Sequence, residues 1–234
     1  MDLDGTLAPI VSRPDLARVP AETLRSIGRA ARGWNARIAV VSARPDRDLR
    51  KLAPVRSLVR IGQYGLEGPL APPRSVRMDV RRRCSRLARV LRPLVRSVPG
   101  AFLEPKGLTV AVHWRNVEGI SARRRLRRSL GGIVRGEARQ QRFVPIPGAE
   151  VLDFVPRGYD KGRALRALCS RLHAGVVFYF GDSAGDEPAF SALGKGDFPV
   201  RVGRSATRAR YRVAGIEGVT RFLDAVAASR AQAA

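Results

Sequence analysis

The stretch ARIAVVSARPDRDLRKLAPVRSLVRI, residues 36–61, joins two short apolar runs through a segment with helical spacing. Residues 36–42 and 57–62 predict buried strands, whereas residues 45–52 predict a helix with Pro45 near its start. A strand, a helix and a strand in succession, with both strands apolar, predict a parallel sheet covered by helices on both faces. We therefore expect an α/β fold of the Rossmann-like type, with its site at the carboxyl ends of the strands.

A different pattern interrupts this alternation. A long helical pattern over residues 76–98 is followed by strand-like runs, a second helical pattern around residues 121–134 and further strand-like runs at 142–146 and 150–155. This order is typical of an α+β insert, and the alternating pattern returns after it. We expect a core domain in two parts, residues 1–74 and 154–234, and an inserted cap domain at residues 75–153.

The net charge of +24 is the strongest feature of the composition. Only Lys51, Lys106, Lys161 and Lys195 are lysines, so 40 of the 44 basic residues are arginines. We interpret this ratio as a compositional bias on solvated surface, because the arginines around residues 81–96 scatter about the predicted helix and aromatic residues are not interleaved with the charge. We expect no specific nucleic-acid partner, although sequence-independent binding to polyanions at low salt is expected.

Other compositional signals are weak. No apolar run approaches the length of a membrane span, and the first residues lack the basic and apolar regions of a signal peptide. Cys84 and Cys169 lie far apart without metal-binding spacing, which predicts two small buried hydrophobic side chains. We expect a cytoplasmic monomer with no membrane partner.

Four short stretches follow predicted core strands and carry reactive side chains. They are DLDGT (2–6), VVSARP (40–45), GYDKG (158–162) and FGDSAGDE (180–187). Each alone has a simple structural explanation, as a turn, a helix cap, a solvated lysine or acids at a helix start. Together, at strand ends, they supply what phosphoryl transfer to a carboxylate needs: a nucleophile, oxygen ligands for Mg²⁺ and a fixed cation.

These four stretches resemble the motifs of the haloacid dehalogenase (HAD) superfamily. The resemblance implies that Asp2 is the nucleophile that forms an aspartyl-phosphate and that Asp4 is the general acid and base. It also implies that Ser42 and Lys161 hold the phosphoryl group, with Thr6 supporting the loop. The implied cofactor is Mg²⁺, bound by Asp2, the main-chain carbonyl of Asp4, Asp182 and Asp186.

Longer strings resemble the trehalose-6-phosphate phosphatase family over nearly the whole chain. They are DLDGTLAPI, VVSARPDRDLRKL, IGQYGLEG, EPKGLTVAVHWR, VLDFVPRGYDKGRAL and FGDSAGDEPAF. The resemblance implies a C2-type cap that closes over a phosphosugar substrate and supplies polar contacts. By position these contacts are Glu104, Lys106, His113 and Arg115 from the cap and Arg44 and Glu67 from the core.

Several of these substrate contacts have alternative interpretations. His113 could be an ordinary strand histidine, Lys106 a solvated turn lysine, and Glu67 a residue of the connection out of the core. Some positions also depart from the family pattern, namely Ala43, Gln63, Tyr64, Ala149 and Ser183, the last standing where an aspartate is common. The expected function is hydrolysis of trehalose 6-phosphate, with two alternatives: another phosphosugar, such as sucrose phosphate or a glycosylglycerate phosphate, or an impaired basic binding module.

The impaired alternative depends on the first strand. Relatives have several apolar residues before the first aspartate of DLDGT, and here only Met1 precedes Asp2. Loss of a central strand removes buried side chains and backbone partners from its neighbours. We therefore expect the true start to lie upstream, and poor folding or low activity for the chain as written.

Overall fold

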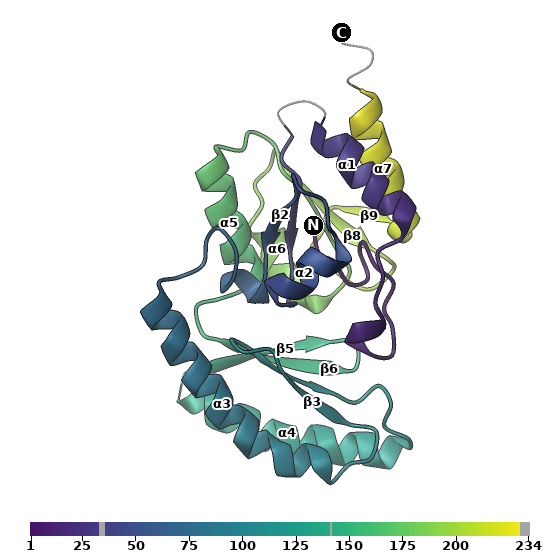
Figure 1. Cartoon of the computed structure of the whole chain (residues 1–234). Coiled ribbons are helices and arrows are strands. Elements are labelled where there is room, and N and C mark those ends of the chain that lie inside the picture. Colours follow the sequence, from purple (N-terminus) through teal and green to yellow (C-terminus); the bar gives the residue numbers. More distant parts are fainter. Residues whose placement is uncertain (33–35, 141, 230–234) are drawn as a thin grey trace. The chain divides into compact units, whose positions relative to one another are not determined.

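A computed structural model describes residues 1–32, 36–140 and 142–229 (Figure 1). The chain divides into two compact units, the first comprising Met1–Ala71 and Asp160–Ala234, the second Pro72–Tyr159. The second unit extends six residues beyond the expected boundary at residue 153. The reason is that strand β6 (Val151–Pro156) pairs along its whole length with β5 (Phe143–Gly148), up to the pair Pro156 and Phe143.

The first unit contains parallel strands, as predicted. Strand β1 (Ala39–Val41) pairs with β2 (Val59–Ile61), and β7 (Phe178–Gly181), β8 (Phe198–Val202) and β9 (Tyr211–Val213) pair in that order. The sequence did not predict β9, because an arginine interrupts its three residues and they form no apolar run.

Helices cover this parallel sheet on both faces, because successive side chains of a strand point to opposite faces. Val40 and Phe180 belong to one apolar cluster, whereas Val41 and Tyr179 belong to another. The first cluster includes side chains of α1 (Ala21–Arg32), α2 (Asp46–Leu52) and α7 (Ile216–Ala228), and the second includes side chains of α5 (Lys161–Leu172) and α6 (Glu187–Ser191). Three short 3₁₀ helices complete the unit, at Pro14–Leu16, Gln63–Gly65 and Ala184–Asp186.

Met1 and Asp2 lie between β1 and β7, where a central strand would run. The amide of Val41 donates to the carbonyl of Met1 (2.9 Å), and the amide of Asp2 donates to the carbonyl of Phe180 (2.8 Å). Beside Met1, an apolar groove of about 780 Å³ continues between the two strands, lined on either side by residues of α5 and α7. The longer first strand expected from the sequence stays a prediction.

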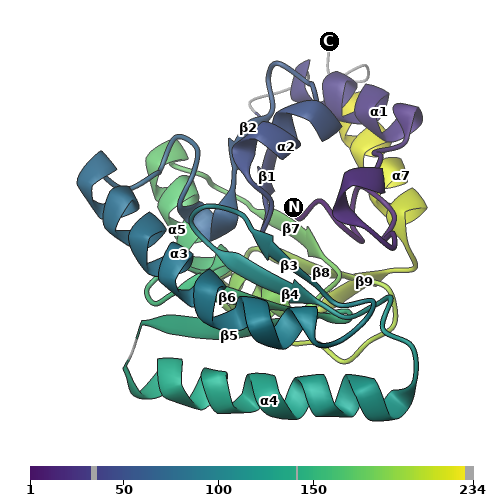
Figure 2. The ribbon, with the colours of Figure 1, turned by 60° about the horizontal axis from the view of Figure 1, so that its bottom comes forward.

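The second unit is an antiparallel sheet with two long helices on one face (Figure 2). The strand order is β3 (Phe102–Pro105), β4 (Val110–His113), β6 and β5. Helix α3 (Arg74–Arg96) packs on β3 and β4, and α4 (Ile120–Arg139) packs on β5 and touches α3. This unit therefore combines an antiparallel sheet with two long helices, and its assignment as a C2-type cap stays a prediction.

Two compositional expectations can be compared with the structure. Cys84 is buried and Cys169 is half-buried, and both thiols are free. Across residues 1–32, 36–140 and 142–229, no helix is both long and apolar enough to cross a membrane.

Candidate active site

The ends of the parallel strands gather the predicted catalytic side chains of the first unit. Asp2 follows Met1 in the central position, Ser42 follows β1 and Asp182 follows β7. Lys161 is the first residue of α5, whose N-cap is Asp160; the Asp160 carboxylate accepts a hydrogen bond from the amide of Arg163 (2.7 Å). Because parallel strands end at the same edge of a sheet, side chains far apart in the sequence meet there.

A buried lysine joins two of the acids. The Nζ atom of Lys161 lies 2.5 Å from Oδ2 of Asp2 and 2.9 Å from Oδ1 of Asp186. All three residues are nearly inaccessible to solvent, with exposed fractions of 5% for Asp2, 3% for Lys161 and 0% for Asp186. Buried charges are stable only when they are paired in this way.

Asp186 is held by more contacts than its neighbours. The hydroxyl of Tyr179 donates to Oδ1 of Asp186 (2.9 Å), and the amide and hydroxyl of Ser183 donate to Oδ2 (3.0 and 2.8 Å). Ser183, which stands where the family pattern has an aspartate, thus completes a capping box with Asp186. The substitution leaves the acidic loop well ordered by hydrogen bonds.

Three carboxylates could hold a metal ion. Oxygen atoms of Asp2, Asp182 and Asp186 all lie within 4.8 Å of one another. Oδ1 of Asp182 is buried and has no hydrogen-bond partner within the described part of the chain, which is costly unless a cation binds it. This all-oxygen donor set suits Mg²⁺, so the residues present fit the implied cofactor.

The backbone makes room for these carboxylates at two glycines. A Cβ atom on Gly5 would lie 2.0 Å from Oδ2 of Asp182, and Gly5 has a φ of +75°. A Cβ atom on Gly181 would lie 2.3 Å from Cγ of Asp186. The glycine of DLDGT is therefore required both by its backbone conformation and by close packing against an acid.

Burial and mutual repulsion change the proton affinities of the acids. Burial raises the pKa of Asp2 to about 8, with a further contribution from Asp186 that Lys161 opposes. Burial and the neighbouring Asp186 raise the pKa of Asp182 to about 6. Burial also acts on Asp186, but Lys161 and Ser183 outweigh it and lower the pKa of Asp186. Without a metal, protons therefore bind to Asp2 and Asp182 at pH values where free carboxyls are ionised.

Asp4 and Arg44 form a pair that the sequence did not predict. Nε and Nη2 of Arg44 each donate to one Asp4 oxygen at 2.7 Å, and Nη1 donates to the carbonyl of Pro14 (2.9 Å). Arg44 is 8% exposed, and its amide donates to the buried Oγ of Ser42 (3.2 Å). Arg44 was predicted as a sugar contact, and here its guanidinium holds the carboxylate predicted to be the general acid and base.

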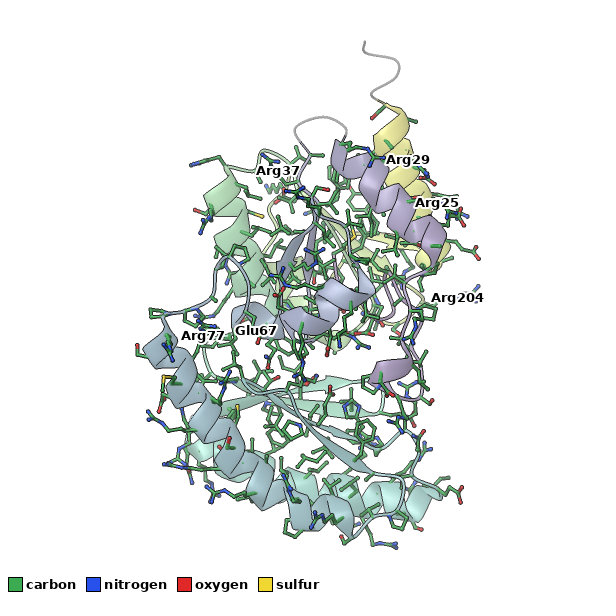
Figure 3. The ribbon with its side chains drawn as sticks, viewed as in Figure 1. Arg25, Arg29, Arg37, Glu67, Arg77 and Arg204 are labelled. Atoms are coloured by element: carbon green, nitrogen blue, oxygen red, sulfur yellow. The ribbon has the colours of Figure 1, made fainter. Side chains whose placement is uncertain are left out.

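Thr6 and Glu67 are two further predicted site residues, and both lie in the first unit. Thr6 is completely buried, and its hydroxyl has no hydrogen-bond partner among the described residues. The carboxylate of Glu67 accepts a hydrogen bond from the amide of Asp46 (2.6 Å) at the start of α2 (Figure 3). A helix N-terminus favours such a negative charge, so Glu67 stabilises α2.

The second unit gathers its own polar cluster on one face of the antiparallel sheet. Oε2 of Glu104 lies 2.8 Å from Nε2 of His113 and 3.7 Å from Nζ of Lys106. Lys106 also binds Asp153 (2.8 Å), and the ring of His113 stacks on Phe102 with centroids 4.2 Å apart. The solvated interpretation of Lys106 is wrong, because its side chain is 7% exposed and paired with acids.

Alternation along the strands separates this cluster from the helices. Glu104 pairs across with Ala111, and Ala111 pairs with Asp153, so these residues share one face. Val110 and Val112 point to the other face, where α3 and α4 pack. Arg115 lies outside the cluster, since its guanidinium donates to the carbonyl of Ala149 (2.7 Å) and approaches Glu150.

Comparison with known proteins connects this geometry to a family. A family model described as trehalose-phosphatase matches residues 1–216. The chain belongs to the trehalose-phosphatase family. It is 29% identical to the trehalose-6-phosphate phosphatase of Escherichia coli over 230 residues, which cover 96% of this chain and 84% of the relative.

Solved structures share the fold of this trehalose-phosphatase family member. A crystal structure of a trehalose-6-phosphate phosphatase related protein covers 100% of the chain, and the chain covers 98% of it, with 22% identity and a TM-score of 0.82. A phosphatase of the HAD enzyme superfamily from Bacteroides thetaiotaomicron covers 96% of the chain, with 92% of its own length matched, at 16% identity and a TM-score of 0.61. The HAD fold predicted from the four motifs is thus shown.

Three residues that contact the predicted site residues of their own unit were not predicted from the sequence. Tyr179 was not singled out, Ser183 was noted only as a departure from the family pattern, and Asp153 lay in a strand-like run without an expected role. Asp153 carried a usable signal, because an acid inside the apolar run VLDFV is unusual unless it is paired. Tyr179 carried none, since its hydroxyl finds Asp186 only after folding.

Proposed function

We propose that this chain is a Mg²⁺-dependent phosphatase that hydrolyses trehalose 6-phosphate to trehalose and phosphate. The observation that carries the proposal is the cluster of the buried Asp2, Lys161 and Asp186 with the half-buried Asp182, in a chain of the trehalose-phosphatase family. A carboxylate nucleophile, a fixed cation and an acidic metal site are the parts that phosphoryl transfer requires.

The proposed reaction has two steps. In the first, a carboxylate oxygen of Asp2 attacks phosphorus, the bond between phosphorus and the sugar oxygen breaks, and Asp4 gives that oxygen a proton. In the second, Asp4 takes a proton from water as the water oxygen attacks the aspartyl-phosphate, which releases phosphate and restores Asp2. Bound Mg²⁺ would be held by Asp2, Asp182, Asp186 and the carbonyl of Asp4, and would neutralise phosphate charge.

The remaining site residues have proposed supporting roles. Lys161 and Ser42 bind the transferring phosphoryl group, and Thr6 holds the loop that follows the nucleophile. Arg44 orients Asp4 through its bidentate ion pair. Glu104, Lys106 and His113 bind sugar hydroxyls, for which adjacent carboxylate, ammonium and imidazole groups offer both acceptors and donors.

The decisive experiment measures phosphate release from trehalose 6-phosphate with and without Mg²⁺. We expect Mg²⁺-dependent release that Asp2→Asn abolishes, because an amide is a poor nucleophile. Sucrose phosphate and a glycosylglycerate phosphate, assayed in parallel, test substrate choice. If either one is turned over faster, it is the substrate instead of trehalose 6-phosphate. If the folded chain releases phosphate from none of these phosphosugars, the catalytic proposal is overturned.

A second assay separates sugar binding from chemistry. Glu104→Gln should raise KM for trehalose 6-phosphate about tenfold or more while turnover of p-nitrophenyl phosphate stays unchanged, because that substrate has no sugar. Glu118→Gln is the matched control, since Glu118 is exposed just before α4. Equal effects of the two substitutions would remove Glu104 from the proposed sugar site.

A further inference from the structure

Arginine is concentrated on two helices of the second unit. Helices α3 and α4 contain 16 of the 40 arginines but only 43 of the 234 residues. They hold one aspartate, one glutamate and no lysine, so 18 of the 20 acids lie elsewhere. A uniform compositional bias would exchange lysine for arginine across the surface, and it would not remove acids from two helices.

The exposed arginines of α3 share one side of the helix, contrary to the scatter predicted from the sequence. Seven of its nine arginines are exposed, and Arg86, Arg89, Arg92 and Arg96 fall within about 120° of its circumference. The opposite side carries Val80, Cys84, Leu87, Leu91 and Val95, which are buried. Arg77, at the start of the helix, is half-buried instead (Figure 3).

Helix α4 repeats this arrangement. Six of its seven arginines are exposed, and Arg124, Arg125, Arg128 and Arg135 fall within about 100° of its circumference. Because α3 and α4 lie on the same side of the sheet and touch each other (Figures 1 and 2), their outer sides form one surface. We call the exposed arginines of α3 and α4 the arginine face.

We propose that the arginine face binds the phosphate backbone of a nucleic-acid duplex without reading its sequence. Guanidinium groups bind phosphate oxygens in pairs, and phosphate contacts fix position rather than sequence. The exposed arginines of α3 extend from Arg74 to Arg96, about 33 Å along the helix, close to one turn of a duplex at about 34–36 Å. None of the residues of the arginine face belongs to the phosphatase site proposed above.

The side chains of the two helices favour a duplex over other polyanions. Neither helix contains an aromatic residue, so neither can stack the bases of a single strand. The large exposed apolar side chains Val76, Met78, Val90 and Ile120 are scattered, and the apolar side of each helix packs on the sheet, so a membrane would gain little by insertion.

The test measures binding of the full chain to a fluorescent duplex of about 20 base pairs, as the anisotropy at salt concentrations between about 50 and 200 mM. Two variants each remove four charges from the arginine face: R86Q/R89Q/R92Q/R96Q and R124Q/R125Q/R128Q/R135Q. The matched control, R25Q/R37Q/R56Q/R204Q, removes four exposed arginines from the first unit, of which Figure 3 labels Arg25, Arg37 and Arg204. Glutamine retains helix propensity, and circular dichroism confirms that each variant is folded.

We expect each face variant to lower the slope of log affinity against log salt by about one for each lost phosphate contact, up to about four. The control should retain the slope of the unaltered chain. Equal losses of duplex affinity in the face and control variants would overturn the proposal, as would the absence of duplex binding at low salt. The proposal would also be overturned if the chain bound phosphatidylserine vesicles or polyglutamate, at matched charge, as tightly as the duplex or more tightly.

Discussion

At the residue scale, the candidate active site depends on how tightly Gly5 packs. Its φ of +75° and the position of Asp182 leave no space for a side chain. Asp-Gly is a common turn dipeptide, and the sequence alone therefore explains this glycine by its conformation. The structure adds a second reason, because the missing Cβ lets Asp182 lie against the loop that carries Asp2 and Asp4.

We predict that Gly5→Ala destabilises the chain by about 2 kcal/mol or more and weakens Mg²⁺ binding, because alanine resists a positive φ and displaces the Asp182 carboxylate. Chemical denaturation and calorimetric titration with Mg²⁺ measure the two effects. Gly28→Ala is the control: Gly28 lies inside α1 with only Arg32 near its Cβ position, so alanine should stabilise the helix by about 0.5–1 kcal/mol. Unchanged Mg²⁺ affinity in Gly5→Ala would contradict the proposed metal site.

At the element scale, the parallel sheet has its weakest point between β1 and β7. Of the residues that the structure describes, only Met1 and Asp2 join these strands by hydrogen bonds, and an apolar groove of about 780 Å³ lies beside Met1. Its lining includes Ile38 of the segment before β1, Leu168 of α5 and Leu223 of α7. Backbone and apolar side chains on both sides of the groove can accept an extended apolar segment.

We predict that appending five β-branched apolar residues ahead of Met1 raises the melting temperature by about 5 °C or more, because a strand there would bury apolar surface and pair with both neighbours. Differential scanning calorimetry measures the change. An extension of five glycine and serine residues serves as the control and should have little effect. Equal melting temperatures for the two extensions would show that the groove does not take a strand.

At the scale of the whole molecule, the protonation of buried carboxylates and the binding of a metal both change the free energy of unfolding of the chain. The pKa values of Asp2 (about 8) and Asp182 (about 6) lie above the ordinary value of 3.8. The folded chain without metal therefore holds protons that the unfolded chain releases between about pH 4 and 8, and its stability falls as the pH rises through this window. Mg²⁺ bound to the carboxylates would offset this loss, because it takes the place of the protons.

We predict that the rise in melting temperature caused by Mg²⁺ is larger at about pH 8 than at about pH 5.5, because protons compete with the metal at the lower pH. Thermal unfolding with and without Mg²⁺ at both pH values measures this difference. In Asp182→Asn the shift caused by Mg²⁺ should shrink at the higher pH. A shift independent of pH in the unaltered chain would mean that Asp2 and Asp182 do not bind the ion.

The local sequence pattern was sufficient to predict many of the helices and strands and most residues of the candidate site. Apolar runs predicted β1 and β2, helical spacing predicted α2 and α3, and the strand ends pointed to Asp2, Ser42, Lys161 and Asp182. These features follow from side-chain periodicity and from the rule that parallel strands end at one edge. A family resemblance carried by long strings supplied the expected chemistry and substrate.

Tertiary structure was needed for every feature that joins residues distant in the sequence. Arg44 pairs with Asp4, Glu67 binds the start of α2, and the Tyr179 hydroxyl binds Asp186, all without a local signal. The apolar run around Asp153 indicates that this acid is paired, but it does not indicate that Lys106 is the partner. The arginine face likewise appears only when two helices, 23 residues apart in the chain, pack on the same side of one sheet. Periodicity shows which side of an element is apolar, whereas the partner of a polar side chain depends on which elements pack together, and that is decided by the burial of the whole core.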